Sequence, residues 1–376
     1  GFNVPFEEFI NNTITRNWGY GYSERGINSV FGSAEVGYKG FIYLTGTVRS
    51  DWFSVLNPEN NNIVYPSVGG SVVFSDMINT LPSWFSFGKL RGSWAQVGNV
   101  TVNPYAVNLT YSISGNTHTV NTGSYTLAGF SGGQRGATIP NPGLLPLTPT
   151  ELEIGADIRF FQDRLGLDFT WYDQTTTDDI LRASISQGSG FNSTYVNVGE
   201  LQNKGIEVLL YGTPVQGAFT WNVSLNFAKN NNEVVSLIEG AEELSLEEPR
   251  TRTVRIKHLV GYPYGMITGW TQKTTPDGRL VYEEDGRPVQ SDAYNIIGYG
   301  VPDFTGGLEN TFTWKGINLS FLIDFKSGGD IYSGTNVRLT QSGLTEVSLQ
   351  GREGKEPLSV TGAIQTGETA DGEPIY

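Results

Sequence analysis

The sequence predicts an all-β protein, and within that class one part of a large antiparallel transmembrane β-barrel. Three observations lead to this prediction: hairpins with one apolar and one polar face, the absence of charge from the apolar faces, and connections that alternate between short and long. The 48 glycines and the 12% aromatic content suit a β protein with many turns. No apolar run reaches the roughly 18 residues of a transmembrane helix. The mean hydropathy of −0.24 suits either a soluble β protein or a barrel.

The clearest hairpin covers residues 151–172, which read ELEIGADIRFFQDRLGLDFTWY. Apolar and polar residues alternate through about ten residues on each side of a turn at Gln162-Asp163, and this period of two gives a β-strand one apolar face. A tilted strand crosses a bilayer in roughly 9–11 residues, so each arm is long enough to do so. The hairpin therefore raises the question of whether protein or lipid covers its apolar face.

Further hairpins with the same alternation precede and follow this one. One turns at Lys39-Gly40, a second at 214–217 and a third at Lys315-Gly316, and single strands are expected at 67–74 and 89–97. The two Lys-Gly sequences predict the same tight turn used twice, with glycine at positive φ. The chain thus predicts a run of neighbouring antiparallel strands.

Charged side chains avoid the apolar phase of the six arms in 151–172, 205–227 and 303–326, where Asn310 is the main polar residue. The charged residues of the polar phase are Glu151, Glu153, Asp157, Arg159, Asp168, Glu207, Glu309, Asp324 and Lys326. A charge at mid-bilayer costs roughly 2–4 kcal/mol, so its absence from one face fits a barrel. The core of a β-sandwich also excludes charge, and this observation alone leaves both architectures open.

The connections favour the barrel. Short turns alternate with long connections, the longest of which cover about 99–149, 174–202 and 230–302. All long connections then leave one end of the sheet, as in outer-membrane barrels with short periplasmic turns, whereas a Greek-key sandwich has no reason to keep this order. Aromatic residues near the arm ends fit interfacial girdles, with ordinary β-propensity as the alternative. They are Tyr38, Phe41, Trp52, Phe160, Phe161, Trp171, Tyr172, Trp221 and Trp314.

Composition excludes several kinds of function. The net charge of −14 argues against a nucleic-acid partner, and the absence of Cys excludes disulfides and thiolate sites. The only histidines, His118 and His258, lie far apart in long connections, without the neighbours that a catalytic or metal site needs. Residues 283–285 are acidic but lack the EF-hand spacing, so Ca²⁺ binding in the outer loops stays open. No catalytic residue, cofactor or metal site is predicted.

Three segments of the long connections have distinctive compositions that do not by themselves determine a role. Residues 239–258 carry an acidic run before Arg250, Arg252, Arg255 and Lys257, which either lines a polar passage or neutralises itself. Residues 276–288 contain two Asp-Gly pairs and predict a small hairpin. The connection at 99–149 is rich in Gly, Ser, Thr, Asn and aromatic residues, a composition that suits sugar stacking, a protein partner or a flexible loop.

Seven segments occur in the order found in one known family. They are FGSAEVGYKGFIYLTGTVRSD (31–51), YPSVGGSVVFSD (65–76), KLRGSWAQVGN (89–99), LTPTELEIGADIRFFQDRLGLDFTWYDQTTTDDIL (147–181), NVGELQNKGIEVLL (197–210), FTWNVSLNFAKNNNEVVSL (219–237) and VPDFTGGLENTFTWKGINLSFLIDFKSGGDIYS (301–333). Together they cover most of 28–333, and the chain resembles the SusC/RagA-like TonB-dependent transporters of the outer membrane of Bacteroidota. The strand at 89–98 departs mildly, because Gly92-Ser93-Trp94 stands where the family is often rich in Ala or Val.

The resemblance implies a barrel of about 22 strands with a plugged lumen. Residues 1–376 are then expected to be an internal segment of a longer protein, a partial barrel without the plug domain and the final strands. The resemblance also implies a transporter and no enzyme, which imports a large nutrient, either a glycan or oligosaccharide or a peptide. Its implied partners are a SusD-like surface lipoprotein, the TonB-ExbB-ExbD complex acting through the plug region, and outer-membrane lipid.

Under this resemblance, the polar phase of the hairpins is expected to face the lumen or the plug. The candidate residues are Glu153, Asp157, Arg159, Asp168, Glu207, Glu309 and Asp324. Two alternatives from other functional classes remain open. One is a passive outer-membrane porin without energy coupling, and the other is a secreted β-sandwich that binds glycans or acts as an adhesin.

Overall fold

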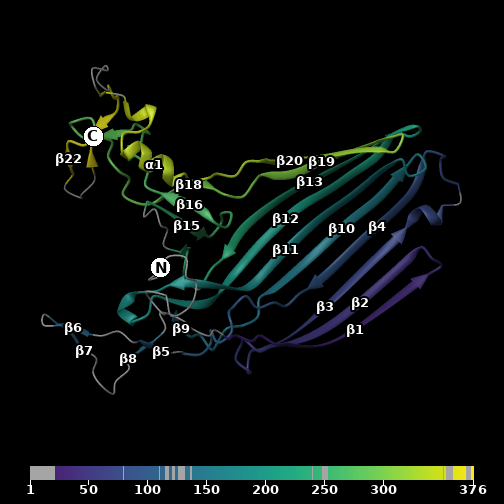
Figure 1. Ribbon diagram of the computed structural model, residues 1–376, viewed down its shortest axis with the longest axis horizontal. Helices are drawn as coiled ribbons and strands as arrows, with labels where there is room; N and C mark the ends of the chain where they lie inside the picture. The colour runs from purple at the N-terminus through teal and green to yellow at the C-terminus, as the bar shows by residue number, and fades with distance from the viewer. Residues whose placement is uncertain are drawn as a thin grey trace, which may run out of the picture.

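The computed structural model describes residues 22–376 except 79, 110, 115–117, 121–122, 126–131, 136–137, 239, 248–252, 350, 353–358 and 370–373. Most long strands form one antiparallel sheet in which each strand pairs with its neighbour along the chain (Figure 1). In spatial order they are β1 (Ile27–Tyr38), β2 (Ile42–Phe53), β3 (Asn62–Val73), β4 (Phe85–Gln96), β10 (Thr148–Phe160), β11 (Leu165–Ser184), β12 (Ser193–Val215), β13 (Phe219–Ser236), β19 (Phe304–Trp314) and β20 (Ile317–Ser327). The predicted all-β class and antiparallel sheet are confirmed.

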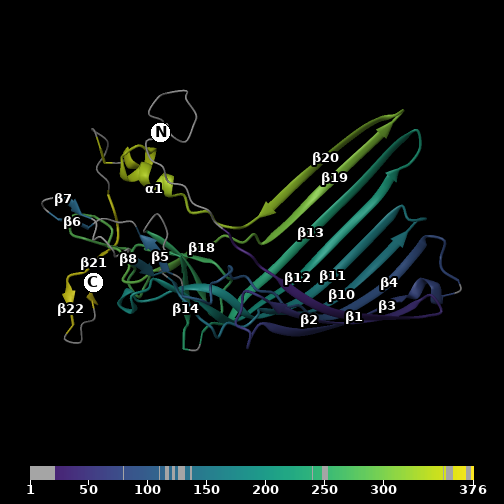
Figure 2. The same cartoon turned by 60° about the horizontal axis from the view of Figure 1, so that its bottom comes forward.

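Short connections gather at one end of the curved sheet and long connections at the other, as Figures 1 and 2 show. The predicted alternation is therefore confirmed in most of the sheet, with two differences. At the short end, the connection 74–84 contains a 3-10 turn and is longer than the connections 54–61 and 185–192 at the long end. The connection expected over 174–202 is mostly strand, because β11 continues to Ser184 and β12 begins at Ser193. Pairing runs from Leu165 opposite Gly212 to Ser184 opposite Ser193, so these two strands extend well beyond the roughly 9–11 residues that cross a bilayer.

The short end is built from turns whose backbone conformations the sequence indicates. Lys39 and Gly40 have φ of 52° and 78°, and Lys315 and Gly316 have φ of 45° and 85°. Both turns have positive φ at the Lys and Gly positions, which suits a tight hairpin, but the first connection has three residues, 39–41, and the second has two. The turn predicted at Gln162-Asp163 forms within the connection between β10 and β11, and the turn predicted at 214–217 overlaps the connection 216–218 between β12 and β13.

Smaller elements form the long end. A four-stranded sheet has the order β14 (Glu243–Glu247), β15 (Val254–Leu259), β16 (Met266–Gly269), β18 (Asn295–Tyr299). The other small strands are β5 (Tyr111–Ser114), β6 (His118–Val120), β7 (Gly123–Tyr125), β8 (Gly132–Arg135), β9 (Thr138–Ile139), β17 (Val281–Tyr282), β21 (Ala363–Ile364), β22 (Gly367–Glu368) and β23 (Pro374–Ile375). The helices at this end are α1 (Gly334–Gln341) and the 3-10 turns η3 (Gln187–Ser189) and η4 (Glu346–Leu349), whereas the 3-10 turn η2 (Phe74–Met77) lies at the short end between β3 and β4. None of the helices in the described residues is long and apolar enough to span a membrane.

The buried apolar cores lie at the long end. One joins Phe53 and Leu56, at the end of β2, to Val100, Leu144 and Ile180. A second joins Val198 of β12 to Val234 of β13 and is covered partly by Leu244 of β14. The long connections are therefore packed structures that extend the sheet beyond the apolar band.

The sheet has two unpaired edges among the described residues, β1 and β20. All residues of β1 are exposed, as are most of β20. A sheet with such edges is an open part of a barrel, because only closure removes the edges.

Candidate functional site

All seven candidate residues lie on one face of the sheet. Glu153, Asp157 and Arg159 share a face because they are separated by even numbers of residues on β10. Cross-strand register places the other four with them. One row across the sheet contains Lys89, Asp157, Asp168, Leu209, Asn226, Gly307 and Asp324, and a second contains Phe87, Arg159, Gly166, Tyr211, Ser224 and Glu309. Glu207 lies opposite Thr170, two residues from Asp168.

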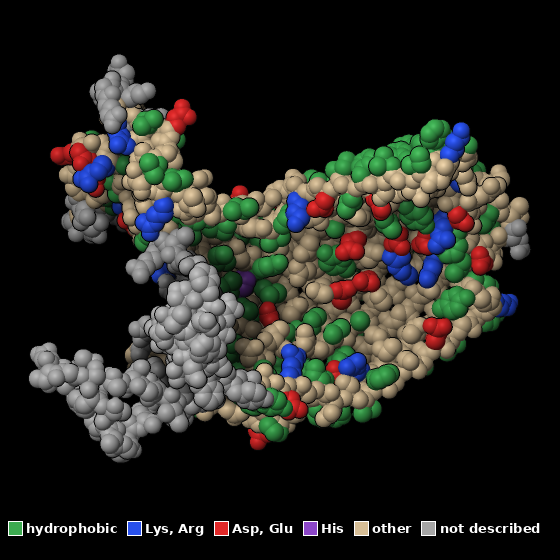
Figure 3. All heavy atoms as spheres, in the orientation of Figure 1, with side chains coloured by type: hydrophobic (Ala, Val, Ile, Leu, Met, Phe, Trp, Pro, Cys, Tyr) green, Lys and Arg blue, Asp and Glu red, His purple; other side chains and the backbone are tan. Residues whose placement is uncertain are grey.

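This polar face is the hollowed one. Figure 3 shows acidic and basic side chains gathered within the concave surface, whereas apolar side chains cover the upper rim of the sheet. We refer to the concave face as the inner wall and to the opposite face as the outer wall. The inner wall carries most of the charges of the long strands, as the alternation predicts.

Arg91 of β4 forms the densest contact of the inner wall. Its guanidinium binds both carboxylate oxygens of Asp168 at 2.6 and 3.1 Å and donates to the hydroxyl of Thr170 at 2.6 Å. Arg91 lies opposite Gly155 of β10, so its side chain reaches across that strand to β11. Two parallel N–H···O bonds fix the orientation of the carboxylate. Sequence reasoning missed Arg91 because the strand at 89–97 was predicted without assigning its faces.

Asp157 and Arg159 form a second pair, two residues apart on β10. The guanidinium contacts the carboxylate at 2.9 Å, and its Cζ lies 4.7 Å from the ring centre of Phe87. This cation–π contact holds the arginine along the row that crosses the sheet. Two of the seven candidates therefore neutralise each other.

Four other candidates have no ion-pair partner among the described residues: Glu153, Glu207, Glu309 and Asp324. Glu153 accepts a long 3.5 Å hydrogen bond from Ser93, and its carboxyl group also forms a hydrogen bond with that of Glu151. The inner wall thus combines fixed charge pairs with carboxylates that remain available to another surface.

Nearer the long end, neutral amides join the charged side chains on the inner wall. The hydroxyl of Tyr172 donates to Asn230 at 3.2 Å, and Asn230 donates to Asn203 at 2.9 Å. Gln174 donates to Glu151 on the neighbouring strand. Tyr172 therefore belongs to the inner wall and not to an interfacial girdle, which corrects that part of the aromatic prediction. Its phase along β11, shared with Asp168 and Thr170, was the available signal.

The outer wall has a bounded apolar band. On β10 it runs from Phe160 to Leu152, a strand length of about 26 Å, which a tilt of about 40° reduces to roughly 20 Å of thickness. Beyond Leu152 the same row contains the ion pair of Asp173 and Lys204, at 3.4 Å. An apolar band of roughly 25 Å is expected on a transmembrane barrel.

Asn310, the polar residue of the apolar phase, is satisfied within the outer wall. Its side-chain oxygen accepts a hydrogen bond from the indole N–H of Trp221 at 3.1 Å, and the residue is only 7% exposed. A buried amide with a partner avoids most of the penalty for burying a polar group.

The four-stranded sheet at the long end is attached to the inner wall. The side-chain oxygen of Asn232 on β13 accepts from the backbone N–H of Tyr264 at 2.7 Å, and Val234 exchanges backbone hydrogen bonds with Tyr262 and Gly261. Asn232 lies opposite Asn203, which is part of the inner-wall amide network. The small sheet therefore extends inward from the wall, and sequence reasoning did not predict it.

His258 of β15 is buried in this attachment and is 5% exposed. Its Nδ1 accepts a hydrogen bond from the backbone N–H of Gly265 at 3.1 Å, which requires this nitrogen to be unprotonated. Burial lowers the pKa of His258 below its ordinary value, and the charge of Asp179 opposes this shift only in part. The structure thus favours neutral imidazole.

The attachment is expected to loosen in acid. The folded attachment disfavours the imidazolium form of His258. Its stability is therefore unaffected at pH values well above the unfolded pKa of about 6.5, and it falls as pH decreases through that value. Hydrogen exchange of Met266–Gly269 in the full-length receptor should show lower protection at acid pH, and His258→Gln should flatten this dependence. Equal protection at pH values on both sides of 6.5 would contradict the expectation.

Other sequence features form no chemical centre. The small hairpin predicted at 276–288 is present, with turns at Asp277-Gly278 and Asp285-Gly286, and Arg287 contacts Asp285 at 2.7 Å. Across the described parts of the chain, no three His, Asp or Glu residues are grouped as a metal site requires. Arg250 and Arg252 lie outside the described residues, and so does the side chain of His118.

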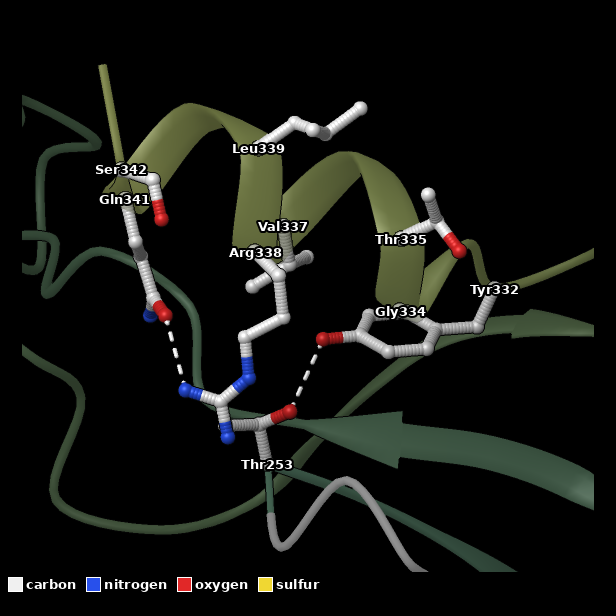
Figure 4. A pocket seen from close by; sticks show the side chains of 9 residues that line it. All are labelled: Thr253, Tyr332, Gly334, Thr335, Val337, Arg338, Leu339, Gln341 and Ser342. Atoms are coloured by element: carbon white, nitrogen blue, oxygen red, sulfur yellow. Dashed lines mark hydrogen bonds between the residues drawn. The ribbon is translucent and has the colours of Figure 1, made fainter. Parts of the chain in front are cut away.

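A cavity of about 420 Å³ lies at the long end between α1 and Thr253 (Figure 4). The hydroxyls of Thr253 and Tyr332 are 2.8 Å apart, and Arg338 donates to the side-chain oxygen of Gln341 at 3.2 Å. The lining is neutral apart from Arg338 and contains no carboxylate or imidazole. It offers hydrogen-bonding groups without a nucleophile or acid–base pair.

Comparison with known proteins agrees with this geometry. The family described as "TonB dependent receptor-like, beta-barrel" matches residues 3–341. TonB-dependent receptor P3 of Formosa agariphila is 28% identical over 350 residues, which cover 84% of this chain and 33% of the receptor. TonB-dependent receptor SusC of Bacteroides thetaiotaomicron is 28% identical over 162 residues, 41% of this chain and 15% of SusC. A solved structure of the RagAB peptide transporter superposes with a TM-score of 0.67 at 25% identity, covering 81% of this chain and 34% of that chain.

The chain spans about a third of the length of the curated receptors P3 and P26 that it matches. The family match confirms the partial barrel, its place in the outer membrane and the absence of an enzymatic role, and it rules out the secreted sandwich. The curved sheet, its apolar outer band and its charged inner wall agree with that match. The chain belongs to the TonB-dependent receptor β-barrel family, and its relatives are SusC-like and RagA-like receptors.

Proposed function

We propose that the full receptor imports a large nutrient, a glycan or a peptide, across the outer membrane with energy supplied through TonB. The observation that carries the proposal is the two-faced wall: an apolar band bounded by charge on one side, and unpaired carboxylates on the other. Such a wall separates lipid from a polar interior. The likeness to the RagAB peptide transporter supports import of a cargo larger than a simple solute.

The inner wall would face the plug and the lumen. The unpaired carboxylates Glu153, Glu207, Glu309 and Asp324 are available to a second polar surface, whereas the pairs Arg91–Asp168 and Arg159–Asp157 hold the wall itself. The plug would seat against this face, and TonB would act on the plug. No covalent chemistry is assigned to these residues.

A SusD-like lipoprotein would bind at the long end. This partner is supported by the two-component RagAB structure, which covers 81% of this chain. The packed connections of the long end offer a large surface there, including the attached four-stranded sheet. The lid and the barrel would together enclose the cargo before it passes the plug.

Uptake measurements test the proposal directly. The full-length receptor, expressed with and without its SusD-like neighbour, is supplied with labelled oligosaccharides and peptides in cells with or without TonB. Saturable uptake that requires both TonB and the receptor is expected. Uptake that persists without TonB would instead support a passive porin.

A further inference from the structure

Three large side chains of the inner wall lie directly opposite glycines on the neighbouring strand. Arg91 is opposite Gly155, Tyr211 is opposite Gly166, and Tyr172 is opposite Gly205. Side chains on a strand normally stand roughly perpendicular to the sheet. These three lie instead over the backbone of their glycine partners.

Distances to a hypothetical side chain show how close this approach is. A Cβ added to Gly166 would lie 2.2 Å from Cζ of Tyr211, and one added to Gly155 would lie 2.7 Å from Cζ of Arg91. Both are far inside van der Waals contact. Glycine in a strand weakens it and is expected where another group approaches the backbone closely. The opposite side chains can therefore lie flat only because these positions are glycine and carry no Cβ.

The flat side chains leave space free in the interior of the barrel. The flat guanidinium of Arg91 crosses β10 over Gly155 and reaches Asp168 and Thr170 on β11. Tyr211 lies over Gly166 in the row that also holds Arg159, which itself lies along Phe87. Large polar groups are thus kept within the thickness of the wall, Arg91 near the middle of β4 and Tyr211 near the short end of the sheet.

We propose that Gly155 and Gly166 are positioning residues that hold Arg91 and Tyr211 flat and so keep the lumen clear for the moving plug and cargo. The proposal rests on the transport function inferred above. A methyl group at either position forces the opposite side chain off the wall and into the lumen. Gly166 provides the cleaner test, because a Cβ at Gly155 would displace Arg91 and so disturb its ion pair with Asp168.

The test uses the full-length receptor with Gly166→Ala, Tyr211→Ala and the double variant. Gly69→Ala is the matched control, since Gly69 is on the same face and its added Cβ meets Ser93 at an ordinary 3.5 Å. Uptake is divided by the amount of heat-modifiable, assembled receptor in the outer membrane. We expect a several-fold loss for Gly166→Ala, and near wild-type uptake for Tyr211→Ala, the double variant and Gly69→Ala.

Recovery of uptake in the double variant distinguishes obstruction of the lumen by Tyr211 from a loss of wall stability. If the uptake of Gly166→Ala falls only in proportion to assembled receptor, or if the double variant is no better than Gly166→Ala, the proposal is overturned. A structure of Gly166→Ala in the full-length receptor gives a readout that needs no transport. The Tyr211 ring should point into the lumen, and a ring that remains flat would also overturn the proposal. Absence of uptake by the unaltered receptor would instead refute the proposed function.

Discussion

Replacing Leu210 by arginine is expected to prevent most of the receptor from assembling in the outer membrane. Leu210 lies in the outer-wall row of Ile158, Leu167, Leu225, Leu308 and Ile323. This row is the second from the short-end edge of the apolar band at Phe160, and an arginine in the band is destabilising by up to the about 2–4 kcal/mol that it costs at mid-bilayer. The fraction of heat-modifiable receptor in outer-membrane preparations measures the effect.

The neighbouring residue offers a closely matched control. Leu209 and Leu210 are both 39% exposed, but Leu209 lies on the inner wall in the row of Asp157 and Asp168. Leu209→Arg places the same charge one residue away in a polar surrounding that contains carboxylates. It should assemble nearly normally, and equal assembly defects in the two variants would show that the outer wall does not face lipid.

Reversing the unpaired charges of the inner wall is expected to abolish most uptake without preventing assembly. In the triple variant Glu153→Lys, Glu207→Lys and Glu309→Lys, no described ion pair is broken, because none of the three has a partner. The altered surface would repel positive groups of the plug that seat against it and attract acidic ones. Uptake and protease accessibility of the plug measure the result.

A control triple variant changes the net charge by the same amount elsewhere. Glu59, Glu284 and Glu346 are exposed residues of the connections at the long end. Their replacement by lysine should leave plug accessibility unchanged. Loss of membrane assembly in the inner-wall variant, without a specific uptake defect, would count against the assignment of Glu153, Glu207 and Glu309 to the lumen.

Period-two alternation was sufficient to predict the two faces of the sheet. It placed Asp157, Asp168 and Glu207 together because pleating fixes the face of each residue, and the Lys-Gly pairs indicated their turns because positive φ favours glycine. These properties depend only on neighbouring residues, so they can be predicted directly from the sequence.

Other features depend on contacts that a sequence does not display. The strands between 174 and 202 continue beyond the apolar band, where the regular alternation ends and Ile180 and Val198 pack into the cores of the long end. The flat orientation of Arg91 depends on a glycine in a strand that follows it by more than fifty residues. The attachment of Tyr264 to Asn232 joins a long connection to the inner wall through a backbone N–H, which carries no residue preference.

The most direct test of the two-faced wall is to measure, for each residue along one strand, whether it faces lipid or water. Because residues 1–376 contain no Cys, single cysteines at 206–211 in a full-length receptor without other cysteines can each carry a fluorophore. Membrane-embedded quenchers should reach probes at Ile206, Val208 and Leu210, and should spare those at Glu207, Leu209 and Tyr211. Quenching without a period of two, or with the opposite phase, would contradict the assignment of the outer wall to lipid and the inner wall to the lumen.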